Sequence, residues 1–354
     1  MRRALVSFLL TLPLFAQLPA GTSRVPFRDD ITDAMHLAAT GDVLWVASFL
    51  DDRIERVETG GARMGLNIPP SWQYTTAVAA GPDGAFWLGS AGWIARVDPA
   101  TEEFQRWPLG MVNGPRALLS GPDGNLWLVQ DGAVLRMRPD GAILSSHQTG
   151  GDPTGAAFGS DGALYLSMPG KLVRMTAAGE RTEFAASPRW VLFAGPSFLW
   201  TADPHSGSEA AQTPVHEIVK MSYRGEILAT YPIDMMPLAA DPLGNLWLRA
   251  RTPAGDVIGQ LTASGVLTRF GPLPSPVSTE CHPRSLGGLT FLADGRVAMS
   301  DYYLLVVNTL LSPCRRVVRP EAAKNTITIL DPRLAPVLSI ETLERSSRRR
   351  SARH

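Results

Sequence analysis

The fold is indicated by one stretch of sequence, Gly121-Pro122-Asp123-Gly124-Asn125-Leu126-Trp127-Leu128-Val129, because weaker copies of it recur along most of the chain. Its Asp-Gly pair is a tight-turn signal, since glycine tolerates the positive φ that hairpins require. The run after this pair is apolar on both alternating faces, as in a strand packed between two neighbouring sheets. A single hairpin cannot bury both faces, so the stretch predicts one unit of a repeated β structure.

Alignment on the Trp of this stretch gives seven anchor positions, at spacings of 42, 40, 38, 35, 47 and 51 residues. The anchors are Trp45, Trp87, Trp127, Tyr165, Trp200, Trp247 and Ala298. Periods near 40 residues with a strand–turn–strand core are typical of propeller blades. The sequence therefore predicts an all-β fold, a seven-bladed β-propeller of four-stranded antiparallel blades over residues 24–332.

The two ends of the predicted propeller suggest how the ring closes. The segment Thr326-Ile327-Thr328-Ile329-Leu330 is either the last strand of the seventh blade or a strand that the N-terminal segment near residues 24–36 completes. Mixing the two ends in one blade removes exposed strand edges, so we expect this closure.

The composition, 45% hydrophobic and 19% charged over 354 residues, belongs to a globular protein. The 33 Gly and 29 Pro indicate turns between many short strands. The formal charge is zero, but without Arg2, Arg3 and residues 344–354 the body holds 26 basic and 32 acidic residues, a net charge near −6. Such a body is a poor partner for nucleic acid. We expect residues 333–354, with their Arg-rich end, to form a basic, disordered tail.

Residues 1–20 have the layout of a secretory signal peptide: two arginines, an apolar run over residues 4–15, and small residues at Ala16 and Ala20 for cleavage. A buried first helix is the alternative, but nothing in the run is amphipathic. The run is short for a membrane span, and no other run reaches that length. We therefore expect a secreted or periplasmic monomer with no integral membrane segment after signal removal.

Cys281 and Cys314 are the only cysteines. Oxidising compartments favour their pairing, and closing a loop of this length would contribute about 3–4 kcal/mol. We expect a disulfide within the last repeat, with two unpaired thiols as the alternative.

The phrases GPDGNLW, VLRMRPDG and VIGQLTASGVLTRF together resemble the blades of the streptogramin B (virginiamycin B) lyase family, over roughly residues 30–330. The resemblance implies a seven-bladed propeller. Lyases of this family linearise a cyclic depsipeptide by elimination across its ester bond, with a divalent metal such as Mg²⁺. Their site uses His after Pro on the innermost strands of the last two blades, where this chain has Met236 and Gly287. The blade motif identifies the architecture better than the reaction.

The innermost positions, counted back from the anchors, supply the candidate ligand-binding residues. Arg116 and Arg189 occupy the same position two blades apart, and their guanidinium groups would suit a carboxylate, sulfate or phosphate in the channel. Alternatively, they neutralise Asp203 and Asp301 or line a wet channel. Thr154 occupies the same position in the next blade, and Gln130 lies three residues after the anchor Trp127, where the family often has Glu. The last candidate is His36 in the inner strand of the first blade, which either faces the channel or simply packs.

Asp203, His205 and Asp301 offer oxygen and imidazole ligands for a divalent metal. The alternative is that both Asp residues are polar strand ends and that His205 lies in an exposed loop, within the insertion over residues 204–214. The leading hypothesis is a propeller that binds a small anionic ligand or a protein partner at the central-channel face. The other is a metal-dependent lyase, eliminating across a C–O bond of a cyclic depsipeptide or related ester, or a hydrolase with these relocated ligands.

Overall fold

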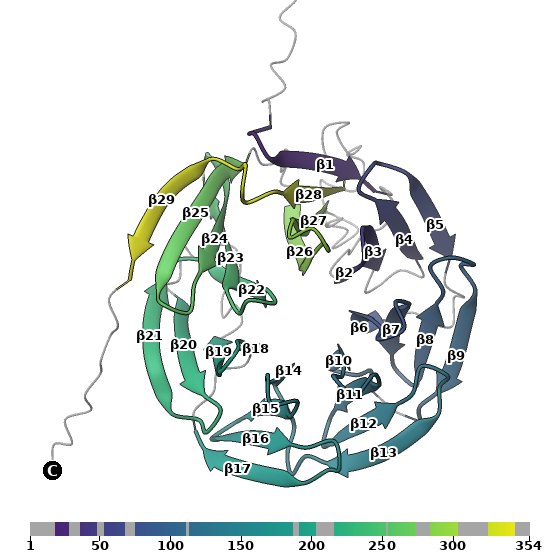
Figure 1. The fold of residues 1–354 in the computed structure, drawn as a ribbon. Helices are drawn as coiled ribbons and strands as arrows, with labels where there is room; N and C mark the ends of the chain where they lie inside the picture. The colour runs from purple at the N-terminus through teal and green to yellow at the C-terminus, as the bar shows by residue number, and fades with distance from the viewer. Residues whose placement is uncertain are drawn as a thin grey trace, which may run out of the picture.

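A computed structural model describes residues 18–27, 36–47, 53–67, 75–110, 113–186, 191–202, 216–252, 254–273, 284–303 and 325–343. All elements in these ranges are strands, and they form seven antiparallel sheets around a central hole (Figure 1). The prediction of an all-β, seven-bladed propeller is confirmed. These ranges hold no helix of the length and apolarity that crossing a membrane requires.

Blades 1 to 6 each follow the chain as an up-and-down meander whose first strand is innermost (Figure 1). Blade 1 holds β2 (His36–Thr40), β3 (Val43–Ala47), β4 (Arg53–Glu58) and β5 (Arg63–Asn67). Blade 2 holds β6 (Thr75–Ala80), β7 (Phe86–Ser90), β8 (Trp93–Val97) and β9 (Phe104–Pro108). Blade 3 holds β10 (Ala117–Ser120), β11 (Leu126–Gln130), β12 (Ala133–Met137) and β13 (Ile143–Gln148).

The next three blades repeat this order. Blade 4 holds β14 (Gly155–Phe158), β15 (Leu164–Met168), β16 (Lys171–Met175) and β17 (Arg181–Ala185). Blade 5 holds β18 (Val191–Ala194), β19 (Phe198–Ala202), β20 (His216–Ser222) and β21 (Ile227–Ile233). Blade 6 holds β22 (Met236–Ala240), β23 (Leu246–Thr252), β24 (Gly255–Leu261) and β25 (Val266–Leu273).

Blade 7 closes the ring with strands from both ends of the chain. From the channel outward it holds β26 (Arg284–Phe291), β27 (Val297–Tyr303), β28 (Thr326–Leu330) and β1 (Thr22–Pro26). β1 pairs antiparallel with β28 and packs Val25 into the seam, the interface between blades 7 and 1 (Figure 1). The predicted closure is confirmed, with the N-terminal segment as the outermost strand.

Blade 6 carries a fifth strand, β29 (Val337–Thr342), inside the segment for which the sequence predicted a disordered tail. It pairs with β25, and Arg269 of β25 forms an ion pair with Glu341 of β29. The Arg269 hydrogen bond holds the pKa of Glu341 below its usual value. The tail prediction is therefore wrong for residues 337–342, because a strand partner far away in the sequence orders them. Residues 344–354 lie outside the described ranges.

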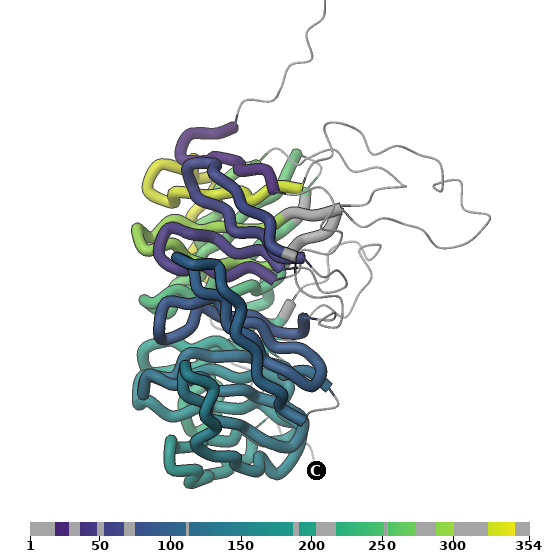
Figure 2. Tube along the Cα trace, turned by 90° about the vertical axis from the view of Figure 1, so that its right-hand side faces the viewer, coloured from purple at the N-terminus to yellow at the C-terminus, as the bar shows by residue number. Residues whose placement is uncertain are grey.

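The disc has two unlike faces. The first strand of each blade begins at one face, which we call the loop face, and ends in a short turn at the other, which we call the turn face. Figure 1 views the turn face, and Figure 2 shows the disc edge-on with the turns along its left side. Any residue that begins a first strand therefore lies beside the channel at the loop face.

The seven anchors form the centre of the packing between blades. All lie on second strands and none is more than 2% exposed. Trp45 of blade 1 stacks on Phe86 of blade 2 with ring centroids 5.0 Å apart, and Tyr165 of blade 4 stacks on Tyr223 beyond β20 of blade 5 at 4.7 Å. Because the anchors join adjacent blades, their spacing reports the blade repeat.

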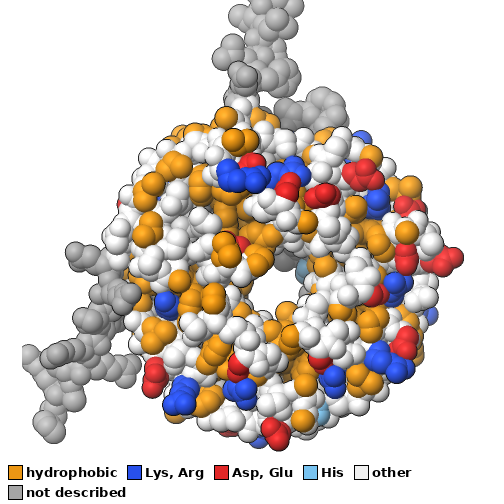
Figure 3. Space-filling model, viewed as in Figure 1, with side chains coloured by type: hydrophobic (Ala, Val, Ile, Leu, Met, Phe, Trp, Pro, Cys, Tyr) orange, Lys and Arg blue, Asp and Glu red, His pale blue; other side chains and the backbone are white. Residues whose placement is uncertain are grey.

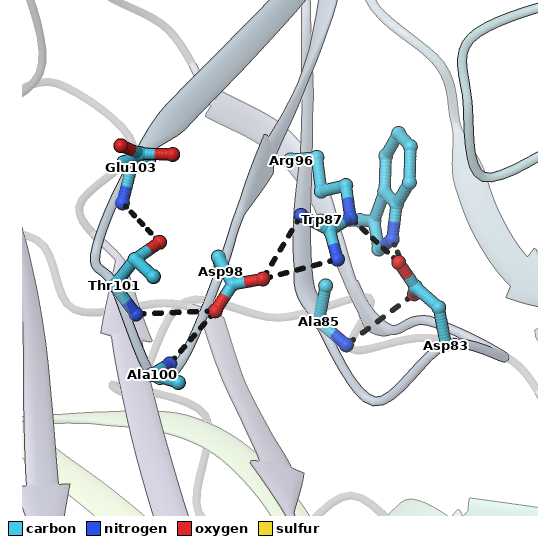
Figure 4. Close-up of polar contacts among 8 residues, drawn as sticks. All are labelled: Asp83, Ala85, Trp87, Arg96, Asp98, Ala100, Thr101 and Glu103. Carbon is cyan, nitrogen blue, oxygen red and sulfur yellow. Dashed lines mark hydrogen bonds and ion pairs between the residues drawn. The ribbon is translucent and has the colours of Figure 1, made fainter.

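In blades 2, 3 and 4 the turn holds the anchor through one carboxylate, and we call this arrangement the turn-carboxylate contact. In blade 2, Asp83 accepts hydrogen bonds from Trp87 Nε1 at 3.1 Å, Arg96 Nε at 2.6 Å and the Ala85 backbone at 3.3 Å (Figure 4). The counterparts are Asp123 with Trp127 and Arg136, and Asp161 with Tyr165 and Arg174.

Glycines allow this turn to form. In blade 3, Gly124 has φ +72°, and a Cβ on Gly121 would lie 2.5 Å from both Asp123 Oδ1 and Trp127 Nε1. The repeated phrase is therefore a turn that places a carboxylate against the buried indole.

The contact also fixes the charge state of its members. Burial by itself would raise the pKa of Asp83, but hydrogen bonds from Arg96, Trp87 and Ala85 outweigh it and hold the pKa below its usual value. Burial, with the negative charge of Asp161, raises the pKa of Tyr165 to about 12. The Asp83 and Asp161 carboxylates therefore stay ionised at neutral pH, and the Tyr165 phenol stays a hydrogen-bond donor.

Candidate functional site

The candidate residues that the structure describes lie at the loop face, where the innermost strands begin. Arg116 directly precedes β10 and Thr154 directly precedes β14, while His36 is the first residue of β2. The count back from the anchors therefore predicted the place of Arg116 and Thr154 beside the channel correctly. They belong to blades 3, 4 and 1, and each makes different contacts.

Arg116 belongs to a polar cluster that is open to solvent. Its side chain is 45% exposed, and its Nε donates a hydrogen bond to Asp131 Oδ1 in the turn between β11 and β12. Asn113 Nδ2 donates to the other oxygen of Asp131 at 3.2 Å. The hydrogen bond from Arg116, followed by that from Asn113, holds the pKa of Asp131 below its usual value. Within the described residues, Arg116 Nη1 and Nη2 make no hydrogen bond, so two charged donors face solvent.

The backbone before Arg116 is held by blade 2. Thr76 Oγ1 of β6 donates to the Pro115 carbonyl at 2.9 Å, and a Cβ on Gly89 of β7 would lie 2.3 Å from Pro115 Cγ. A Cβ on Gly114 would likewise lie 2.2 Å from Thr76 Oγ1. Two glycines thus permit a close approach of blades 2 and 3, and this approach fixes the segment that carries Arg116.

His36 joins blades 1 and 2. Its Nε2 lies 2.9 Å from the carbonyl oxygen of Thr75, which only accepts hydrogen bonds, so Nε2 carries the proton. Burial lowers the pKa of His36 more than the bond to Thr75 raises it. The imidazole is therefore neutral at pH 7, and its Nδ1 makes no hydrogen bond within the described part of the chain.

Thr154 and Gln130 are less suited to ligand binding than the sequence suggested. The Thr154 hydroxyl lies 3.2 Å from the Ser167 carbonyl and 3.0 Å from Ser167 Oγ, so it is engaged within blade 4. Gln130 ends β11 and is partly buried. The acidic residue near this point is Asp131, one position further on. Asp131 lies four residues after the anchor Trp127, so the pattern of residues three after each anchor does not include it, and no sequence pattern pointed to Asn113.

A second charged pair that sequence reasoning missed lies inside blade 6. Arg249 of β23 and Asp256 of β24 form an ion pair at 2.6 Å, each with 3% of its side chain exposed. Arg249 is the middle residue of β23, and Asp256 is the second residue of β24, which begins at the loop face. The residue three after the anchor of blade 6 is Ala250, so the anchor pattern does not point to Arg249.

The remaining candidates lie outside what the structure describes. Asp301 belongs to β27, where its backbone pairs with Leu286 and Thr326, but its side chain is not among the described atoms. The other candidates outside the described ranges are Arg189, Asp203, His205, Cys281 and Cys314. The metal site and the disulfide therefore stay predictions, as does the signal peptide, which falls largely on residues 1–17. Within the described ranges, no group of three or more His, Cys, Asp or Glu side chains is placed to hold a metal ion.

The comparisons with known proteins agree with the fold. The family model described as the virginiamycin B lyase family matches residues 24–191, which span most of β1 and all of blades 1 to 4. The resemblance to this lyase family is confirmed. No curated protein matches the sequence at a significant level.

Solved propellers match over most of the chain. A streptogramin B lyase structure is 19% identical, covers 88% of this chain and 98% of its own, and has a TM-score of 0.60. A selenomethionine-substituted virginiamycin B lyase from Staphylococcus aureus is 17% identical, with coverages of 88% and 99% and a TM-score of 0.61. The WD40 propeller domain of Doa1 is 11% identical, with coverages of 88% and 97% and a TM-score of 0.60. At these identities the likeness shows the fold alone.

Proposed function

We propose that this protein is a binding propeller that takes a small anionic ligand at the mouth of its central channel on the loop face, with Arg116 as the charged contact. The proposal rests on the exposure and the contacts of the Arg116 side chain. It stands 45% exposed beside an innermost strand, with a carboxylate on Nε and two terminal nitrogens open to solvent.

A guanidinium whose two terminal nitrogens are open to solvent is suited to binding oxyanions. Its planar fork presents paired N–H groups that match the oxygens of a carboxylate, sulfate or phosphate. Asp131 and the Thr76–Pro115 hydrogen bond hold the group in place before any ligand arrives, which lowers the ordering cost of binding. Neutral His36 and Asn113 add further polar groups at the same face.

The test is calorimetric titration of the purified chain with succinate, inorganic phosphate and sulfate. Arg116→Ala should weaken binding of the tightest of these probes at least tenfold, because the charged donors are lost. The matched control is Arg138→Ala, which removes an exposed arginine paired with Asp140 at the turn face, and which should leave the affinity unchanged. Equal loss in both variants, or no binding of any probe below millimolar concentration, would contradict the proposal.

The second candidate function is a metal-dependent lyase or hydrolase, and the observation that favours it is the family match over residues 24–191. The groups that would hold the metal are those of Asp203, His205 and Asp301, whose side chains lie outside the described part of the chain. Calorimetry with Mg²⁺ on the purified chain, repeated with Asp301→Ala, tests this candidate. Stoichiometric binding that the variant loses would favour it, and absence of binding would exclude a Mg²⁺-dependent reaction.

A further inference from the structure

Blade 1 differs from blades 2 to 4 at one register position on the turn face. In all four blades the anchor of the second strand pairs with an arginine of the third strand. The pairs are Trp45 with Arg56, Trp87 with Arg96, Trp127 with Arg136 and Tyr165 with Arg174. In blades 2 to 4 the turn carboxylate binds this arginine, so its charge is balanced within the blade.

The turn of blade 1 does not supply a carboxylate to Arg56: Asp42 lies in this turn but forms no ion pair with Arg56 among the described residues. Only residues 41 and 42 separate β2 from β3, whereas residues 81–85 separate β6 from β7. Trp45 Nε1 donates instead to Thr40 Oγ1 at 3.0 Å. Among the described residues, Arg56 forms one ion pair, from Nη1 to Glu58 Oε1 at 2.7 Å. Its Nε is buried and has no hydrogen-bond partner within the described residues.

The short turn leaves a hollow of about 580 Å³ between blades 1 and 2. Arg56 lies in its wall with Thr40 and Val43 of blade 1 and Gly81 and Pro99 of blade 2, and the other lining residues are Ala or Gly. Thr40 is already engaged by Trp45. Arg56 is therefore the only charged residue among those that line the hollow. Figure 3 views this face and shows that most of its basic side chains lie close to acidic ones.

We propose that this hollow, which we call the Arg56 pocket, binds a small organic acid with an apolar body. The carboxylate pairs with the Nε and Nη2 edge of Arg56, which is the side of the guanidinium that Glu58 leaves open. The body of the acid lies against Val43 and Pro99. Because Nε is covered, the acid meets Nη2 first and the guanidinium then turns to bring Nε to the second oxygen.

Two physical arguments favour this ligand over a neutral one. A buried N–H without an acceptor costs free energy, and a ligand that supplies the acceptor removes that cost. A two-pronged guanidinium–carboxylate pair is also stronger than a neutral hydrogen bond. The volume lies within the usual range for small-molecule sites, about 300–1,000 Å³. The pocket is on the opposite face from Arg116, so it is independent of the channel-mouth site.

The experiment is a ligand-detected NMR titration of the purified chain with benzoate as the probe and benzyl alcohol as its neutral analogue. Benzoate should bind, and benzyl alcohol should bind at least tenfold more weakly. Arg56→Gln should weaken benzoate at least tenfold. Ala100→Trp, a change at an exposed residue that lines the pocket, keeps Arg56 and should block benzoate without altering the core.

One control separates the pocket from the other arginines of this face. Arg136→Gln removes the arginine at the same register position in blade 3, where the turn carboxylate is present, and should leave benzoate affinity unchanged. Equal binding of benzoate by wild type and Arg56→Gln, or equal affinities of wild type for benzoate and benzyl alcohol, would overturn the proposal.

Discussion

Blades 2 to 4 and the seam between blades 7 and 1 are stabilised in different ways. The middle blades each close on a turn carboxylate that binds an aromatic anchor and an arginine. At the seam the parts of this contact are separated. Blade 1 has Trp45 and Arg56 without the carboxylate, and blade 7 has Asp294 in its turn with Ala298 as the anchor.

Apolar packing replaces the polar contact at the seam. Val25 and Phe27 from the N-terminal segment pack with Leu44 and Val46 of blade 1 and Ile327 of blade 7, and all of them are buried. The middle of the ring is therefore specified by residues close together in the sequence. The seam is specified by residues from the two ends of the chain.

Removal of β1 should lower the stability of the protein more than any of the substitutions below. A chain that begins at residue 28 lacks Val25 and Phe27, whose burial is worth about 3–6 kcal/mol together, and it exposes the edge of β28. We expect its urea midpoint to fall sharply. The control begins at residue 21 and keeps the whole of β1. Equal urea midpoints for the two chains would show that the seam does not depend on β1.

Loss of a turn carboxylate should have the next largest effect. Asp123→Ala removes the acceptor for Trp127 Nε1, Arg136 Nε and the Asn125 backbone, and should lower the free energy of unfolding by about 2–3 kcal/mol. Asp294→Ala in blade 7 removes exposed hydrogen bonds to Arg296 and the attraction of Arg333, and should cost less than about 1 kcal/mol. Urea unfolding of both variants measures the difference. Equal costs would mean that the turn carboxylate does not distinguish the middle blades.

The contrast between blades also explains which parts of the fold the sequence could predict. The anchors and their Asp-Gly turns are local signals, and the structure places all seven anchors on second strands. β29 could not be predicted in this way, because its partner Arg269 lies far from Glu341 in the sequence and its own segment adjoins an Arg-rich end. Closure by both ends was predictable only from the general cost of exposed strand edges.

The candidate site was predicted less completely. Counting from the anchors placed Arg116 correctly, but the carboxylate that binds it is Asp131 rather than Asp203 or Asp301, the partners weighed from the sequence. The turn after β11 determines that partner. Arg56 could not be singled out from sequence, because its significance depends on a turn three residues shorter than those of blades 2 to 4 and on the hollow beside it.

Acid should lower the stability of wild type more than that of a variant without the turn carboxylate of blade 3, and this effect should be smaller than the two above. Hydrogen bonds hold the pKa of Asp123 below its usual value against the opposing effect of burial. A carboxyl with a lowered folded-state pKa contributes stability above its unfolded pKa of about 3.9 and loses it as pH falls through the folded value. Wild-type stability should therefore fall below about pH 4 more steeply than that of Asp123→Asn. Urea midpoints between pH 7 and 2.5 test this, with exposed Asp152→Asn as the control. Identical slopes for wild type and Asp123→Asn would contradict it.

The smallest loss of stability should come from substitution of Thr40, which replaces the turn carboxylate as the acceptor for Trp45 in blade 1. Thr40 Oγ1 accepts the hydrogen bond of Trp45 Nε1, and the Trp45 side chain is fully buried. Thr40→Val keeps the shape but leaves the indole N–H without its acceptor, and should cost about 1 kcal/mol. Thr40→Ser keeps the hydroxyl and should cost less. If urea unfolding gives both variants the same stability, Trp45 does not need this acceptor, and packing alone stabilises blade 1.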